Sequence, residues 1–316
     1  MLSKHVGPAS EKTYQFCWKK FYNFIEENNY LDSLSENHIT LFFKTLIQEK
    51  LSYNSLLNYR SALSVPLRLL WPSFNLMNNI NNELLFKYHK TNYKKPRNYF
   101  PPWDLDSVIN YLISEEFRDK CSEDIEWYFR KVLFFCALAS PKRISEFHAV
   151  TLADSSISKS SITLRPHESF IAKNHSHSYR PNDISIPSLP SEFCPVKLLY
   201  DYIKLSKEMC KNKKLDRPPQ LWINKYCKPV SKNQIRHWIR SIILLGDSSA
   251  RKEDARFHSV RGVVASNLYR HFDLDTVIKS MSWKASSTFL KHYSKLGLIT
   301  DKRIVLAGRI INDEIN

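Results

Sequence analysis

The sequence predicts a mainly α-helical protein with a small antiparallel β-sheet, divided into two domains. Apolar side chains recur every three or four positions from residue 10 to about residue 89, which is the helical period. Two short segments, 161–165 and 183–187, instead alternate polar and apolar residues, as half-buried strands do. Between 91 and 102, prolines with adjacent charges can continue neither element. A chain of 316 residues is also long enough for two domains.

The same patterns give the boundaries of these domains. Residues 1–95 are predicted to form a helical bundle, 96–102 a linker, 103–298 a second domain and 299–316 a tail. In the second domain, helices are predicted over 103–118, 123–139, 195–210, 231–245, 256–271, 273–281 and 285–294. The tail is predicted to form an amphipathic helix that docks onto a neighbouring subunit or folds back on the core of its own chain. The apolar residues on this helix are Ile304, Val305, Leu306, Ile310 and Ile311.

Charge indicates a polyanionic partner. Lysine and arginine number 47 against 31 aspartate and glutamate residues, a net charge of +16, which attracts nucleic acids and gains affinity by releasing their counterions. A solvated basic surface would have the same composition, so charge alone leaves that alternative open. The residues expected to contact DNA phosphates in the first domain and linker are Lys19, Arg60, Lys94, Lys95 and Arg97.

Several other classes of protein are disfavoured. The six cysteines form no C-x-x-C pair, so neither a disulfide framework nor a zinc ribbon is expected. His167, His175, His177 and Cys194 match none of the common zinc spacings. The five scattered glycines form neither a P-loop nor a dinucleotide-binding motif, which disfavours nucleotide-driven chemistry. No cofactor is expected. The N-terminus lacks a signal peptide and the apolar run 132–139 is too short for a bilayer, so no membrane partner is expected.

Three pieces of the last third, residues 257–261, Trp283 and residues 291–293, suggest phosphodiester chemistry with a tyrosine nucleophile. His258 and Arg261 are three residues apart on one predicted helix, so their side chains share a face. Farther upstream, Arg143 follows the helix-breaking Ser140-Pro141 after one intervening lysine and supplies a second guanidinium for the phosphate. Tyr293 would attack phosphorus and form a 3′-phosphotyrosine, while His258 donates to the phosphate or accepts the phenol proton. Each residue alone has an ordinary structural explanation, and the combination favours the site.

Three further residues complete the predicted site. Trp283 can donate its indole N–H to a phosphate oxygen. Lys173, between the two predicted strands, is the expected general acid for the leaving oxygen, with Lys142 and Lys159 as rivals. Glu146 is expected to orient Arg143 or His258 through a charge-assisted hydrogen bond.

These stretches resemble the tyrosine recombinase (phage integrase) family, and most of all the branch carried by Crypton and DIRS-type mobile elements. The matching segments are 140–146, 170–173, 258–262, 282–283 and 288–293. The resemblance implies a helical core-binding domain over 1–95 and an α+β catalytic domain over 103–298, closing on duplex DNA as a C-shaped clamp. Gly262, Trp283 and the Pro141-Lys142 turn depart from the family's commoner pattern.

The resulting hypothesis is a site-specific recombinase or integrase of a mobile element that acts on double-stranded DNA without metal or ATP. It implies a dimer on one site, a tetramer in synapsis, and a nuclear location in a eukaryote or the nucleoid otherwise. Three alternatives remain: a type IB topoisomerase-like relaxing enzyme, a domesticated DNA-binding protein that no longer cuts, and a metal-dependent integrase with three carboxylates.

Overall fold

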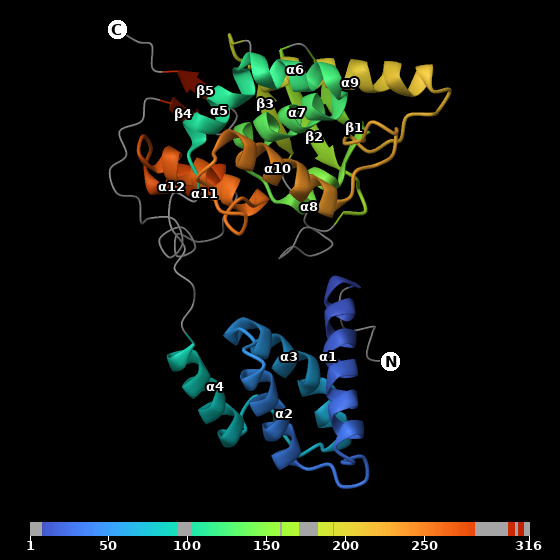
Figure 1. The fold of residues 1–316 in the computed structure, drawn as a ribbon, viewed down its shortest axis with the longest axis vertical. Coiled ribbons are helices and arrows are strands. Elements are labelled where there is room, and N and C mark those ends of the chain that lie inside the picture. Colours follow the sequence, from blue (N-terminus) through green and yellow to red (C-terminus); the bar gives the residue numbers. More distant parts are fainter. Residues whose placement is uncertain are drawn as a thin grey trace. The chain divides into compact units, whose positions relative to one another are not determined.

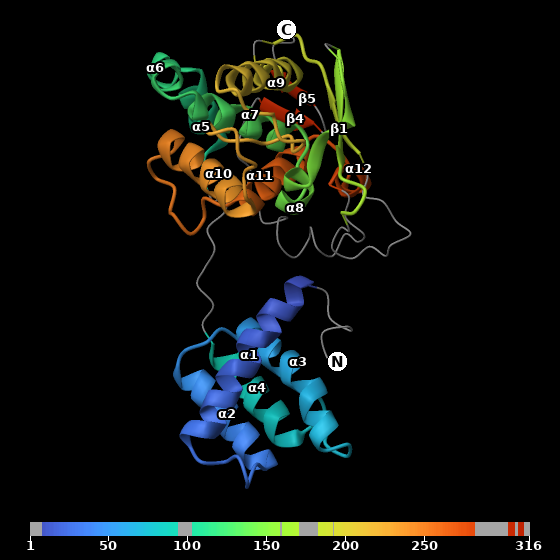
Figure 2. The same cartoon turned by 90° about the vertical axis from the view of Figure 1, so that its right-hand side faces the viewer.

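The computed structural model describes residues 8–93, 103–158, 160–170, 183–191, 193–281, 303–306 and 309–312. The chain divides into two compact units, Met1–Arg97 and Asn98–Asn316, which we call the N-terminal and C-terminal units (Figures 1 and 2). No helix in the described ranges combines the length and the apolar composition that crossing a bilayer needs. All six cysteines are free thiols.

The N-terminal unit is a helical bundle around an aromatic core. Its described helices are α1 (Pro8–Glu27), α2 (Glu36–Gln48), α3 (Tyr53–Leu70) and α4 (Ile80–Asn92). The side chains of Ser52 and Asn79 cap α3 and α4 by accepting main-chain N–H groups of their first turns. Phe42 of α2 is buried at the centre, with its ring 5.0 Å from that of Phe21. The predicted helical bundle is therefore confirmed.

Helices make up most of the C-terminal unit. They are α5 (Leu105–Ile113), α6 (Glu115–Glu123), α7 (Ile125–Ala139), α8 (Ile144–His148), α9 (Pro195–Asn212), α10 (Lys232–Gly246), α11 (Phe257–Tyr269) and α12 (Leu274–Ser280). The single helix predicted over 103–118 is instead two, because Ser114 ends α5 and its hydroxyl caps α6 by accepting the N–H of Phe117. The last eight residues of α7 are all buried.

A three-stranded antiparallel sheet completes this unit. Strand β2 (Ser161–Pro166) lies between β1 (Val150–Ile157) and β3 (Ile184–Pro187), in the order β1-β2-β3. Ile162 pairs with Ile186 and Leu164 with Ile184, and all four side chains are buried. The predicted fold class, mainly α with a small antiparallel sheet, is thus confirmed. The sequence does not predict β1, whose register shifts between Thr151 and Ser156 and breaks the alternation.

The tail differs from its prediction. The tail 299–316 is predicted to carry an amphipathic helix, but β4 (Arg303–Leu306) and β5 (Arg309–Asn312) form an antiparallel hairpin. The helical prediction is wrong because the segment is rich in β-branched isoleucine and valine, which favour strands, and only two residues separate Leu306 from Arg309. β4 lies against α11 and α7, so the hairpin contacts its own unit.

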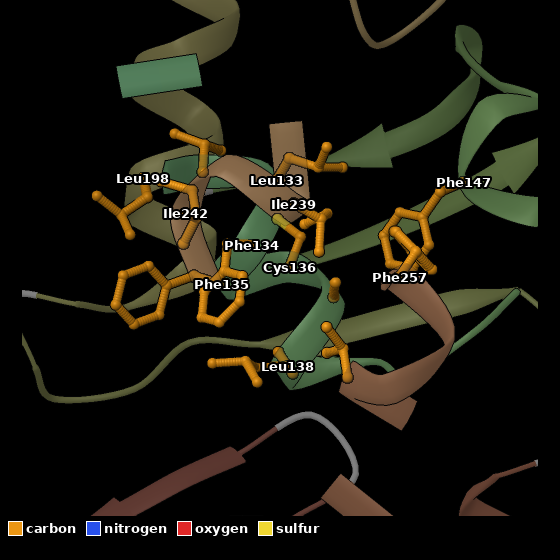
Figure 3. Packing of buried hydrophobic residues seen from close by; sticks show 14 of the residues in the cluster. Leu133, Phe134, Phe135, Cys136, Leu138, Phe147, Leu198, Ile239, Ile242 and Phe257 are labelled. Atoms are coloured by element: carbon orange, nitrogen blue, oxygen red, sulfur yellow. The ribbon is translucent and has the colours of Figure 1, made fainter. Parts of the chain in front are cut away.

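The core of the C-terminal unit fixes three helices against one another. Phe147 of α8 and Phe257 of α11 lie side by side in Figure 3, with ring centroids 5.7 Å apart and an interplanar angle of 65°. Ile239 and Ile242 bring α10 into the same apolar cluster, against residues of α7 such as Leu133. The N-terminal ends of α8 and α11 are consequently held close to α10, and it is here that the candidate site forms.

Candidate active site

Arg143 is held at the start of α8 through its main chain. Its N–H donates to the carboxylate of Glu146 at 2.5 Å, and Glu146 is buried with 8% of its surface exposed. From the sequence, Glu146 is expected to orient the side chain of Arg143 or His258. Within the described ranges its recorded hydrogen bond goes to the main chain, and no ion pair joins it to the guanidinium of Arg143. The charge of Arg143 therefore stays available to a ligand.

His258 and Arg261 lie one turn apart at the beginning of α11. His258 is exposed, whereas Arg261 is only 3% exposed. The Nη2 of Arg261 donates to the carbonyl oxygen of Met281 at 2.8 Å, at the C-terminal end of α12. Carbonyl groups at a helix C-terminus carry partial negative charge, which stabilises the buried guanidinium and fixes its direction.

The first turn of α11 is also tied to the start of the C-terminal unit. Ser259 exchanges hydrogen bonds with the main chain of Arg256, the residue that caps the helix. The indole N–H of buried Trp103 donates to the hydroxyl of Ser259 at 2.8 Å. Trp103 directly follows the predicted linker, so the residue that begins this unit stabilises the helix that carries His258 and Arg261.

Three of the predicted site residues share one cavity. It has a volume of about 350 Å³, near the lower end of the range for small-molecule sites. Its lining residues are Arg143, Ile144, Ser145, Arg236, Arg240, Ala255, Arg256, Phe257, His258 and Arg261. Five arginines and one histidine therefore face a space that no described carboxylate lines. Such a cavity attracts anions, and arginine favours phosphate because its planar fork donates two parallel hydrogen bonds.

Three arginines of this cavity are not among the predicted site residues. Arg236 and Arg240 lie one turn apart on α10, on an exposed face beside the one that buries Ile235 and Ile239. That i,i+4 spacing is visible in the sequence, but it does not reveal which cavity the exposed face borders. Arg256 immediately precedes α11 as its N-cap residue, and its place in the cavity likewise depends on tertiary structure.

Lys142 adds a further positive charge close to Arg143 and Arg261. It is 9% exposed, and burial lowers the pKa of its ammonium. The nearby charges of Arg261 and Arg143 lower this pKa further, while Glu146 acts in the opposite direction. The candidate site is thus strongly electropositive.

Six predicted site residues lie outside the described residues. They are Lys94, Lys95, Arg97, Lys173, Trp283 and Tyr293. Their roles stay predictions.

The two predicted DNA contacts of the N-terminal unit differ in their surroundings. Lys19 is exposed, borders a groove of about 480 Å³ along α1 and α2, and forms no ion pair with any described residue. Its neighbour Lys20, in contrast, pairs with Glu49. The guanidinium of Arg60 lies over the ring of Phe86, with 5.3 Å between its Cζ and the ring centroid. Lys19 thus presents its charge to solvent, while Arg60 contributes to the packing of α3 against α4.

Comparison with known proteins bears on both units. Residues 1–68 match the family described as phage integrase, N-terminal SAM-like domain. The structure is similar to XerH site-specific recombinase bound to a palindromic difH substrate in a post-cleavage complex, with a TM-score of 0.59 at 17% identity, covering 92% of this chain and 78% of that one. The chain has the fold of the tyrosine recombinases.

Two more structures show this tyrosine recombinase fold. A lambda integrase dimer bound to a COC′ core site gives a TM-score of 0.58 at 11% identity, covering 95% of this chain and 94% of that one. The Tn1549 transposon integrase in complex with transposon right end DNA gives 0.56 at 13% identity, covering 90% of this chain and 89% of that one. The sequence matches no curated protein. At these identities the similarity extends to the fold of both units and leaves function to be argued from the site.

Proposed function

We propose that the protein is a site-specific DNA recombinase or integrase of a mobile element, which cuts and rejoins DNA through Tyr293. The observation that carries the proposal is the cavity in which Arg143, His258 and Arg261 converge, and to which the described part of the chain contributes no carboxylate. A phosphodiester fits this cavity because guanidinium groups bind its non-bridging oxygens. The phage integrase match of residues 1–68 and the fold shared with XerH and lambda integrase support the same conclusion.

The proposed reaction balances without a cofactor. The phenolic oxygen of Tyr293 bonds to phosphorus as the bond to the 5′ oxygen breaks, which leaves a 3′-phosphotyrosine and a 5′ hydroxyl. His258 accepts the phenol proton, and Lys173 supplies a proton to the leaving oxygen. A 5′ hydroxyl of the exchanging strand then attacks the phosphotyrosine and releases Tyr293. One phosphodiester is broken and one is formed, so rejoining requires no ATP.

Arg143 and Arg261 supply the electrostatic stabilisation in this mechanism. Charge builds on the non-bridging oxygens as Tyr293 attacks, and Arg143 and Arg261 donate hydrogen bonds to them. Arg261 is already oriented by its bond to the carbonyl of Met281, so little reorganisation is needed. Trp283 adds an indole N–H donor to the same oxygens. Loss of one such donor typically slows the reaction about 10²–10³-fold.

Strand exchange also requires more than one subunit. Lambda integrase, which has the same fold, has been seen as a dimer on a core site and as a tetramer on a Holliday junction. We extend this to the present chain as a dimer on one DNA site and a tetramer in synapsis.

Denaturing capture tests the proposal. The full-length protein is mixed with a supercoiled plasmid library of genomic fragments, the reaction is stopped with detergent, and covalently attached DNA is sequenced. We expect an adduct that survives chelator and disappears in Tyr293→Phe, because only the phenol forms the phosphotyrosine. Tyr200→Phe is the matched control, since Tyr200 is an exposed residue of α9 that does not line the cavity.

The outcomes separate the alternatives. An adduct that persists in Tyr293→Phe would refute the assignment of the nucleophile. Salt-sensitive DNA binding without any adduct would indicate the non-cleaving DNA-binding protein instead. Relaxed plasmid without exchanged strands would indicate the topoisomerase-like enzyme.

A further inference from the structure

The face of α10 that borders the cavity carries two arginines with preset directions. Arg236 donates from Nη1 to the amide oxygen of Asn233 at 2.6 Å, and Arg240 donates from Nε to the carbonyl oxygen of Ala255 at 3.3 Å. Both acceptors are neutral, and neither arginine forms an ion pair with any residue that the structure describes. Each guanidinium is therefore oriented while its charge and most of its five N–H donors remain available.

The charge in this cavity exceeds what one phosphate can balance. A phosphodiester carries a single negative charge, and Arg143 and Arg261 already match its two non-bridging oxygens. Arg236 and Arg240 add two more positive charges within the same cavity of about 350 Å³. Like charges this close repel one another in the free protein, so binding is favoured when further negative charge enters. In duplex DNA the next phosphate of the same strand follows at a rise of about 3.4 Å.

We infer that Arg236 and Arg240 form a second phosphate-binding site, which holds the DNA phosphate adjoining the scissile one in the same strand. The two side chains project from the same face of α10 one helical turn apart, so both contact the same phosphate. This site positions the cut strand and takes no part in the chemistry. The inference rests on the proposed function only in calling the neighbouring phosphate scissile.

Salt dependence of DNA binding tests the site without requiring cleavage. The probe is a random-sequence duplex of about three helical turns, bound by the wild type, by the double variant Arg236→Gln/Arg240→Gln, and by Arg118→Gln. Arg118 is an exposed arginine on α6, at the opposite end of the C-terminal unit from α8 in Figures 1 and 2. The slope of log affinity against log salt concentration should become shallower by about 0.9 in the double variant, which is the loss of one phosphate contact. Arg118→Gln should keep the wild-type slope.

A second measurement locates the phosphate. At a cleavage site mapped by denaturing capture, each phosphate adjoining the scissile one is replaced in turn by an uncharged methylphosphonate. One of the two replacements should slow adduct formation by the wild type and leave the already slow double variant unchanged, because the two changes remove the same contact. The inference would be overturned if the double substitution and the methylphosphonate slowed adduct formation additively at both of the phosphates that adjoin the scissile one.

The two proposals fail in different ways. A shallower slope in the double variant with no Tyr293-dependent adduct would retain the phosphate site and refute the recombinase chemistry. A Tyr293-dependent adduct with equal slopes for the wild type and the double variant would retain the chemistry and refute the phosphate site. Absence of DNA binding by the wild type would refute both.

Discussion

At the scale of a single residue, Lys142 shows how positive charge is concentrated in the candidate site. Its side chain is nearly buried next to Arg143 and Arg261, and burial, followed by these two charges, lowers its pKa below the ordinary value of 10.5. Glu146 offsets only part of this effect. A charged Lys142 is therefore held in the folded protein at a cost in stability, which is a common feature of sites that bind anions.

This cost predicts a pH dependence. Between the lowered pKa of Lys142 and 10.5, the unfolded chain holds the proton that the folded chain has released. The free energy of unfolding contributed by Lys142 therefore rises with pH across that window, by at most about 1.4 kcal/mol per pH unit, and is constant below it. Lys142→Met keeps the length of the side chain and removes the titration.

Denaturant unfolding of the wild type and Lys142→Met at a series of alkaline pH values measures this contribution. Cysteine and tyrosine titration affects both proteins equally, so only the difference between the two curves matters. We expect the wild type to gain stability relative to the variant as pH rises. Curves that stay parallel throughout the window would contradict a lowered pKa.

The residues of the candidate site were predictable where they share one short segment. His258 and Arg261 lie three positions apart on one helix, and the Ser-Pro break before Arg143 marks a helix start. The contribution of Arg236 and Arg240 was not predictable, since their chemistry depends on α10 meeting α8 and α11. A helical period shows that two side chains share a face, but only packing shows what that face borders.

At the scale of elements, close contact between α10 and α5 sets the position of the arginine-bearing helix. Gly246 is the last residue of α10, and a Cβ there would lie 2.6 Å from the Cα of Val108 in α5. That distance is shorter than real carbon contacts allow, and the obstacle is main chain rather than a flexible side chain. The two helices approach this closely only because position 246 has no side chain.

Gly246→Ala should therefore destabilise the C-terminal unit. In an ordinary helix the same change stabilises by about 1 kcal/mol, so the sign of the effect is diagnostic. Here we expect a loss of about 1–3 kcal/mol in the free energy of unfolding, because overpacking forces the main chains apart. Thermal unfolding should show a midpoint lower by several degrees. A midpoint equal to or above that of the wild type would show that α5 yields without strain.

Elements with a strong period were predictable and irregular ones were not. The apolar stripe of α10 and the wholly buried end of α7 both appear in the sequence as helices of nearly the observed length. Strand β1 was missed because its register shift interrupts the alternation. In the tail, the apolar residues of 304–311 are compatible with either period, and local strand propensity together with a two-residue connection decides for a hairpin.

At the scale of the whole molecule, each unit has a core of its own. Among the residues that the structure describes, the apolar cluster of the N-terminal unit comes from positions before 90, and that of the C-terminal unit from positions after 102. The segment 91–102 between these two clusters contains prolines with adjacent charges, so the division into two units could be predicted from the sequence. A unit with its own core can fold alone.

We therefore expect residues 1–97, expressed alone, to form helices and to unfold in one cooperative transition in urea. Circular dichroism measures this transition. Phe42→Ala should lower the stability of this fragment by about 3–5 kcal/mol, because Phe42 is buried against several other aromatic rings. Phe16→Ala is the matched control, since Phe16 is 64% exposed on α1 and should have little effect. So small a unit has a stability of only several kcal/mol, so Phe42→Ala should leave much of it unfolded. An unstructured wild-type fragment, or equal effects of the two substitutions, would mean that the N-terminal bundle depends on the rest of the chain for its stability.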